Sequence, residues 1–185
     1  MKNSRVYMVR LATLAMMAAV SCVLVLIVTV PFPLFPAFRY DLADVPILIT
    51  TFLFGPVYGV ALTAFVSLIQ AFVLGQDGWL GAFMHVCATG GFAIVAGLIY
   101  RRNKTRKSAI IALVAGTLFM TFLMCILNYI MDPLFYGMPQ DAVAALMLPA
   151  IIPFNLSKAG LNSLITFIIY KRISKMVHKA EMKES

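Results

Sequence analysis

The stretch Pro149-Ala-Ile-Ile-Pro-Phe-Asn-Leu-Ser-Lys-Ala-Gly-Leu-Asn162 places one lysine, Lys158, inside an apolar run that continues to Tyr170. A charged residue at membrane depth costs at least about 2.5–3.5 kcal/mol on insertion scales, so it normally faces a partner, a cavity or a ligand. Asn155, Lys158 and Asn162 are spaced at i, i+3 and i+7, which is one helical face. The stretch therefore predicts a membrane helix with one polar face that other parts of the chain approach.

The composition is that of a small integral membrane protein. Of the 185 residues, 62% are hydrophobic and only 12% are charged, and one compact domain, residues 1–185, is expected. The net charge of +8 does not indicate nucleic acid, because the basic residues fall at the ends of apolar runs. The three cysteines stand singly inside apolar runs without metal-ligand spacing, and we interpret them as core residues without a disulfide.

Six apolar stretches predict an all-α bundle of six transmembrane helices. The first lacks a cleavage site and is interpreted as a retained helix. The second is too short to cross the roughly 30 Å hydrocarbon core, so we expect it to be buried against protein. A further apolar piece covers residues 142–148. The six predicted helices are residues 6–30, 45–54, 57–74, 79–100, 108–131 and 151–170.

Charge placement predicts that both termini are cytoplasmic. Most of the 15 basic residues lie before or within the start of the first helix, in the loop 101–107, or in the tail 171–183. The positive-inside rule puts these three segments in the cytoplasm, so an even number of helices separates them. The acidic residues agree, because those between the helices fall in segments predicted to lie outside: Asp41, Asp44, Asp77, Asp132 and Asp141.

The two longest outer loops predict a covered pocket that opens outward. The loop 31–46 is rich in proline and aromatic residues, so it is expected to form an ordered apolar flap between the first two helices. The connection 132–141 has a similar composition. Lys158, counted roughly 12 Å below the outer boundary, would lie near the level of Asn128 and His85. Few polar groups in an apolar, aromatic cavity are typical of a small-molecule site.

Each polar residue also has a structural interpretation. Asn155 and Lys158 could form interhelical hydrogen bonds, or Lys158 could pair with an acidic residue such as Asp44 or Asp132; a ligand role is favoured because Lys158 is too deep to reach the interface easily. Asn128 fits either role equally well, and packing is favoured for His85. The chain has no P-loop, metal-ligand or nucleophile motif. We therefore expect no catalytic residue, no metal and no enzyme activity.

Three motifs resemble one transporter family. Tyr40-Asp-Leu-Ala-Asp-Val-Pro46, Phe54-Gly-Pro-Val-Tyr-Gly59 and Pro153-Phe-Asn-Leu-Ser-Lys158 resemble the substrate-binding S components of energy-coupling factor (ECF) vitamin transporters. The Asn-x-x-Lys pattern in the last helix, with Asn128 late in the fifth, is most similar to the riboflavin-specific members.

The resemblance implies a ligand and a set of contacts. Asn128, Asn155 and Lys158 would bind the polar edge of the flavin ring, with His85 in the same pocket. The loop around residues 38–44 would close over the ligand through Tyr40, Asp41 and Leu42, and Tyr40 could stack on the ring. A neutral ligand leaves Lys158 without a counter-charge, so a nearby carboxylate or loss of its proton is expected.

The resemblance also implies partners and a location. Ala15 and Ala19 in the first helix would dock the transmembrane coupling subunit, which connects to two cytoplasmic ATPase subunits. The protein would be a multi-pass protein of a prokaryotic cell membrane, in contact with lipid, with riboflavin as transported ligand rather than cofactor. Other possibilities are carriage of flavin mononucleotide, an S component for thiamine, biotin or a related heterocycle, or a structural subunit without a ligand. Thiamine is disfavoured because its positive charge would lie beside Lys158.

Overall fold

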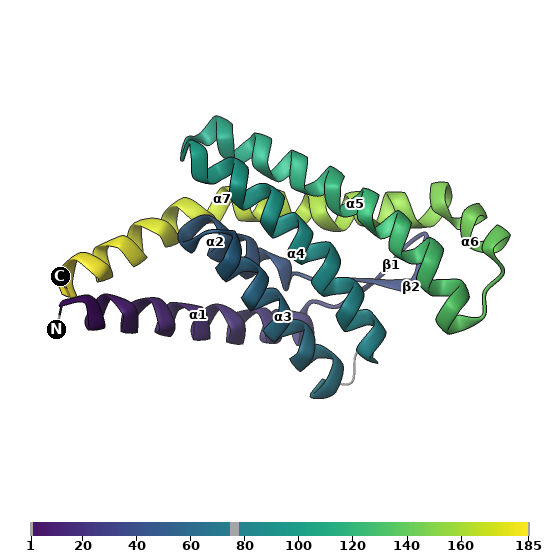
Figure 1. The fold of residues 1–185 in the computed structure, drawn as a ribbon, viewed down its shortest axis with the longest axis horizontal. Coiled ribbons are helices and arrows are strands. Elements are labelled where there is room, and N and C mark those ends of the chain that lie inside the picture. Colours follow the sequence, from purple (N-terminus) through teal and green to yellow (C-terminus); the bar gives the residue numbers. More distant parts are fainter. Residues whose placement is uncertain (1, 75–77, 185) are drawn as a thin grey trace.

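A computed structural model describes residues 2–74 and 78–184, so the predicted outer residue Asp77 lies outside the described part. Apart from one β-hairpin the described chain is helical, and it has six helices when α6, η1 and α7 are taken as one continuous segment (Figure 1). In chain order the elements are α1 (Lys2–Ile27), β1 (Val30–Phe32), β2 (Phe35–Tyr40), α2 (Asp44–Phe54), α3 (Pro56–Phe72), α4 (Gly78–Arg102), α5 (Arg106–Tyr136), α6 (Gln140–Leu146), η1 (Met147–Ile151) and α7 (Ile152–Glu184).

Within these two ranges, four helical segments are long and apolar enough to cross a membrane, whereas α2 and α3 are shorter. The short second helix is therefore confirmed. Helix α2 is apolar around most of its circumference and is buried along nearly its whole length, from Asp44 to Phe52. Such a helix belongs in the core rather than against lipid. It contacts α1, α3, α4 and α7, which explains how a helix too short for the bilayer is accommodated.

A sharp corner joins α2 to α3. Gly55 adopts a φ of +102°, a backbone conformation that other residues rarely adopt, and Pro56 then begins α3. The two helices pack so closely that a Cβ on Gly59 would lie 2.0 Å from Thr51 Oγ1. Gly97 of α4 meets the same corner, where a Cβ would lie 2.9 Å from Pro56 Cβ. These two glycines therefore serve internal packing.

The loop between the first two helices is ordered, as predicted, and it forms a hairpin. Strand β1 pairs antiparallel with β2 from Val30↔Tyr40 to Phe32↔Phe35. Helix α1 ends at Ile27 rather than at residue 30 because Val30 already belongs to β1. A hairpin this small is marginal on its own and needs packing against helices. That packing comes from Phe154 of α7, against which Phe32 and Phe38 lie.

Two predicted helix ends are wrong. Helix α5 does not stop at residue 131 but continues through Pro133 to Tyr136, and Gly137 then ends it in the left-handed conformation. Proline removes only one helical hydrogen bond, and membrane helices tolerate it. The last helix does not stop at residue 170, because the basic tail is helical to Glu184.

The arrangement of the ends agrees with an even number of crossings. Figure 1 shows the N- and C-termini close together at one end of an elongated bundle, with the α4–α5 connection towards the same end. The hairpin and α6 lie towards the opposite end. The cytoplasmic placement of both termini stays a prediction from the charge distribution.

Candidate substrate-binding cavity

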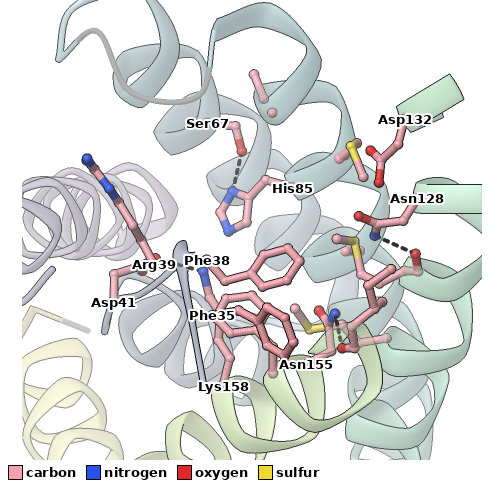
Figure 2. Close-up of a pocket in the computed structure, with 18 of the residues that line it drawn as sticks. Phe35, Phe38, Arg39, Asp41, Ser67, His85, Asn128, Asp132, Asn155 and Lys158 are labelled. Atoms are coloured by element: carbon pink, nitrogen blue, oxygen red, sulfur yellow. Dashed lines mark hydrogen bonds and ion pairs between the residues drawn. The ribbon is translucent and has the colours of Figure 1, made fainter. Parts of the chain in front are cut away.

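A cavity of about 490 Å³ lies among the hairpin, α3, α4, α5 and α7. The hairpin contributes Phe35 and Phe38, which lie in the middle of the close-up view between residues of α4 and α7 (Figure 2). Phe38 stacks on Phe154 of α7 with ring centroids 4.9 Å apart and an interplanar angle of 19°. Methionines from α4 and α5 contribute to the apolar lining: Met84, Met120 and Met124. The predicted aromatic pocket under the outer loop is therefore present.

Helix α7 brings Asn155 and Lys158 to the cavity wall. The turn before it, η1, is a π-turn, in which the Ile152 N–H donates to the carbonyl of Met147, five residues earlier. Pro153 has no N–H and cannot complete the α-helical bond to Pro149. Asn155 is 2% exposed, and its Nδ2 donates to the carbonyl of Ile151 at 2.8 Å.

The counter-charge of Lys158 is Asp41, which follows the hairpin. Lys158 Nζ donates to Asp41 Oδ2 at 2.7 Å, and both side chains are largely shielded from solvent. The other carboxylate oxygen, Oδ1, accepts from the backbone N–H of Ala43 at 2.9 Å. The expected nearby carboxylate is thus present, and it is neither of the two candidates named above, Asp44 and Asp132. The pair links α7 to the loop that covers the cavity.

Asn162 does not line the cavity; it ties the same loop to the bundle. It is fully buried, and its Nδ2 donates to the carbonyl oxygen of Asp41 at 3.2 Å and to Asp44 Oδ2 at 3.3 Å. Its Oδ1 accepts from the Tyr40 hydroxyl at 3.1 Å. Lys158 and Asn162, one turn apart on α7, therefore hold both ends of the short segment 40–44.

A hydrogen-bonded chain continues from Asp44 into α3 and α4. Asp44 Oδ1 lies 2.9 Å from His85 Nε2, and His85 Nδ1 lies 2.7 Å from Ser67 Oγ. Thr89 adds a bond by donating to Asp44 Oδ1 at 3.1 Å. His85 is thus packed and hydrogen-bonded, as the sequence favoured, and it also lines the cavity.

The direction of one bond in this chain depends on the tautomer of His85. Ser67 Oγ lies 2.7 Å from the carbonyl oxygen of Thr63 and also 2.7 Å from His85 Nδ1, and its one hydroxyl proton can be donated to either. On the other side of the ring, His85 Nε2 is hydrogen-bonded to Asp44 Oδ1. The Lys158–Asp41 ion pair carries no net charge.

Helix α5 forms another wall. Asn128 lines the cavity and is 5% exposed, with its Nδ2 donating to the carbonyl of Met124 at 2.7 Å. Asp132, one turn further along, also lines it. Asn128 of α5 and the pair Asn155 and Lys158 of α7 are therefore brought to one cavity.

Two loop residues predicted to contact the ligand, Tyr40 and Leu42, do not line the cavity. Asp41 does line it. Leu42 packs against the hydrophobic core, and Tyr40 bonds to Asn162. Burial raises the pKa of the Tyr40 hydroxyl above its ordinary value, and the charges of Asp41 and Asp44 act in the same direction while Lys158 opposes them. Tyr40 therefore stays a donor at neutral pH.

Sequence reasoning missed several residues of the site. Phe154 had a signal, because it lies inside the quoted stretch beside Asn155, yet its stacking with the hairpin depends on tertiary packing. Ser67 and Gln70 lie three residues apart on α3, and both line the cavity. That spacing would have placed them on one helical face. The bond from Asp44 to His85 joins residues 41 positions apart and has no local signature.

The predicted docking residues lie elsewhere, on α1. Ala15 and Ala19 are exposed, as are Leu11, Met16 and Val23 on the same helix. By contrast Ala93, which has the same small-residue spacing with Gly97, is fully buried inside the bundle. The alanine pair of α1 is therefore open to a neighbour, whereas the pair of α4 is used internally.

The arrangement offers binding chemistry. It combines amide donors and acceptors, the neutral Lys158–Asp41 ion pair, the His85–Asp44 hydrogen bond and a stacked aromatic wall. The described residues contain no group of three side chains that could hold a metal ion.

Comparison with known proteins assigns the family. Residues 9–170 match the family described as "ECF transporter, substrate-specific component". The riboflavin transporter RibU of Staphylococcus aureus (strain TCH60) is 31% identical over 177 residues, covering 92% of this chain and 93% of that protein. The riboflavin transporter FmnP of Bacillus subtilis (strain 168) is 24% identical over 180 residues, covering 92% and 94%.

A solved structure has the same fold. It is described as "Structure and mechanism of the S component of a bacterial ECF transporter", and it superposes with a TM-score of 0.77 at 32% identity, covering 91% of this chain and 96% of the other. A structural subunit without a transport role does not agree with these matches. The chain belongs to the family of ECF transporter substrate-specific components, which makes it a multi-pass bacterial membrane protein and a transporter component rather than an enzyme.

Proposed function

We propose that the cavity binds riboflavin and that the protein delivers it to an ECF transporter. The observation that carries the proposal is the combination of three polar side chains, Asn128, Asn155 and Lys158, with an aromatic hairpin in a cavity of about 490 Å³. This volume lies within the range of about 300–1,000 Å³ usual for small-molecule sites. The names of the relatives from S. aureus and B. subtilis support the same ligand.

The chemistry of the flavin ring matches these walls. Its pyrimidine edge carries carbonyl acceptors and one imide N–H, and each asparagine can both donate and accept, while the Lys158 ammonium donates. Its wide apolar face can pack on Phe38 and Phe154, since offset-stacked aromatic pairs are favourable. In this pose α5 and α7 bind the polar edge.

The charge balance favours a neutral ligand. Lys158 is paired with Asp41, so repulsion from Lys158 alone does not exclude a cation such as thiamine, contrary to the argument from sequence. The Lys158–Asp41 pair instead disfavours either sign, because it is already neutral and a charged ligand such as thiamine or biotin would bring one uncompensated charge into a shielded site. Riboflavin leaves the balance unchanged.

The exposed alanines of α1 support a docking role. We propose that the transmembrane coupling subunit packs on the α1 face that contains Ala15 and Ala19, since small residues allow a second helix to approach closely. Two cytoplasmic ATPase subunits would then supply the energy.

The test is direct ligand binding. The protein purified in detergent is expected to carry flavin absorbance or to bind added riboflavin tightly, and excess thiamine or biotin is expected not to displace it. Competition with flavin mononucleotide decides whether the phosphorylated form is also accepted. No tight riboflavin binding by folded protein would refute the proposal, and displacement by thiamine would transfer the assignment to that vitamin.

A further inference from the structure

One polar atom at the cavity has no partner in the described structure. Among residues 2–74 and 78–184, four buried side-chain polar atoms lack a hydrogen bond: Thr50 Oγ1, Gln70 Nε2, Thr166 Oγ1 and Tyr170 Oη. Of these residues, only Gln70 lines the cavity. A buried donor without a partner costs about 1–3 kcal/mol, which a ligand acceptor can recover.

Gln70 differs from the other amide side chains of the cavity in the hydrogen bonding of its nitrogen. Three amide side chains line the cavity: Gln70, Asn128 and Asn155. The two asparagines each donate to the backbone carbonyl four residues earlier, at 2.7 and 2.8 Å. The nitrogen of Gln70 makes no such bond within the described residues. Both N–H donors of Gln70 are therefore open to a bound molecule, whereas each asparagine keeps one N–H and its carbonyl oxygen.

The position of Gln70 on α3 indicates which part of riboflavin it would contact. Gln70 lies in the last turn of α3, three residues after Ser67, so both lie on the face that α4 and the cavity share. The proposed riboflavin pose gives the pyrimidine edge to α5 and α7. Away from that edge, riboflavin offers the ribityl hydroxyls and the ring nitrogen N5, which is a weaker acceptor, while the dimethylbenzene end offers none. We therefore assign the donor on α3 to the ribityl chain, and N5 is the alternative that lumiflavin retains.

We propose that Gln70 is the residue that recognises the ribityl chain, by donating from its amide nitrogen to a hydroxyl oxygen. This inference rests on the proposed function, since it takes the flavin ring as already bound by α5 and α7. The flavin ring would then be selected by one wall of the cavity and the sugar-alcohol chain by another.

The test compares two ligands on matched variants. Lumiflavin has a methyl group in place of the ribityl chain and keeps the ring. Gln70→Leu is expected to weaken riboflavin binding about three- to tenfold, the worth of one neutral hydrogen bond, and to leave lumiflavin binding unchanged. Asn155→Leu is the control and is expected to weaken both ligands. Gln70→Met, which keeps an unbranched side chain, replaces the leucine variant if that one is unstable in a thermal scan.

The outcomes separate the two proposals. Equal losses for riboflavin and lumiflavin in Gln70→Leu would overturn the ribityl assignment, and so would unchanged riboflavin affinity. Either result leaves riboflavin binding by the unsubstituted protein intact. If the unsubstituted protein binds no riboflavin, the proposed function is refuted and the role of Gln70 is refuted with it.

Discussion

The Asp41→Asn substitution is expected to release the loop that covers the cavity. Asparagine keeps the size of the side chain and the Oδ1 that accepts from Ala43, and it removes the charge that faces Lys158. The Lys158 ammonium then stays in a shielded place without its carboxylate. We expect lower stability and weaker riboflavin binding, because the loop and α7 are no longer held together at this point.

The magnitude follows from the geometry of the pair. Opposite charges 2.7 Å apart attract by about 6 kcal/mol at an effective dielectric constant of 20. Desolvation offsets part of this attraction, and removing one partner of a buried pair typically costs about 3–5 kcal/mol. The side chains keep 12% and 15% exposure, for Lys158 and Asp41 respectively, so solvent screens the pair slightly. We therefore expect a loss of about 2–3 kcal/mol.

A double-mutant cycle measures this value. Thermal unfolding in detergent is compared for Asp41→Asn, Lys158→Met and the double variant, with and without riboflavin. The double variant is expected to lose less than the sum of the single variants, with a coupling free energy of about 2 kcal/mol. Lys179→Met, at an exposed position of α7, is the matched control and is expected to change stability by less than about 0.5 kcal/mol. Additive single effects would refute the reasoning.

Two further predictions concern packing and docking. Gly116→Ala places a Cβ 2.2 Å from the buried ring of Phe92 and is expected to lose about 1–3 kcal/mol in a thermal scan. In Gly160→Ala the new Cβ meets no heavy atom of a neighbouring element within 4 Å, so the stability is expected to stay the same or to rise by up to about 1 kcal/mol. Equal losses of stability in Gly116→Ala and Gly160→Ala would contradict the described packing. Tryptophan at Ala15 or Ala19 is expected to abolish riboflavin uptake by cells while leaving binding in detergent unchanged. Loss of binding would count against a docking role.

The helices were predictable because each contains an apolar run bounded by polar, glycine or proline residues, and the error at α5 has a local cause. Pro133 after Asp132 has the composition of a loop, yet one more helical turn follows before Gly137. The helical tail was missed because residues 171–184 are polar, and Tyr170, in the apolar run before them, already packs on the rings of Phe52 and Tyr100. Local polarity does not reveal that a helix continues beyond a packed segment.

The site was predictable where burial of a polar residue is costly. Lys158 and Asn155 stood out because amides and ammonium groups are rare in apolar runs. The choice of Asp41 as the partner of Lys158 was not predictable, since it joins residues 117 positions apart and depends on the path of the hairpin. The same is true of the bond between Asp44 and His85. Residue type indicated that partners were needed, and only the fold determined which ones.

The π-turn at Met147–Ile151 determines how α6 is rotated about the helix axis relative to α7. Before it, Val143 is fully buried; after it, Asn155 and Lys158 line the cavity. An α-turn at this place would hold one residue fewer and rotate α6 by about 100° relative to α7. The extra residue therefore sets how the buried face of α6 is oriented relative to the cavity face of α7 on one continuous helical path.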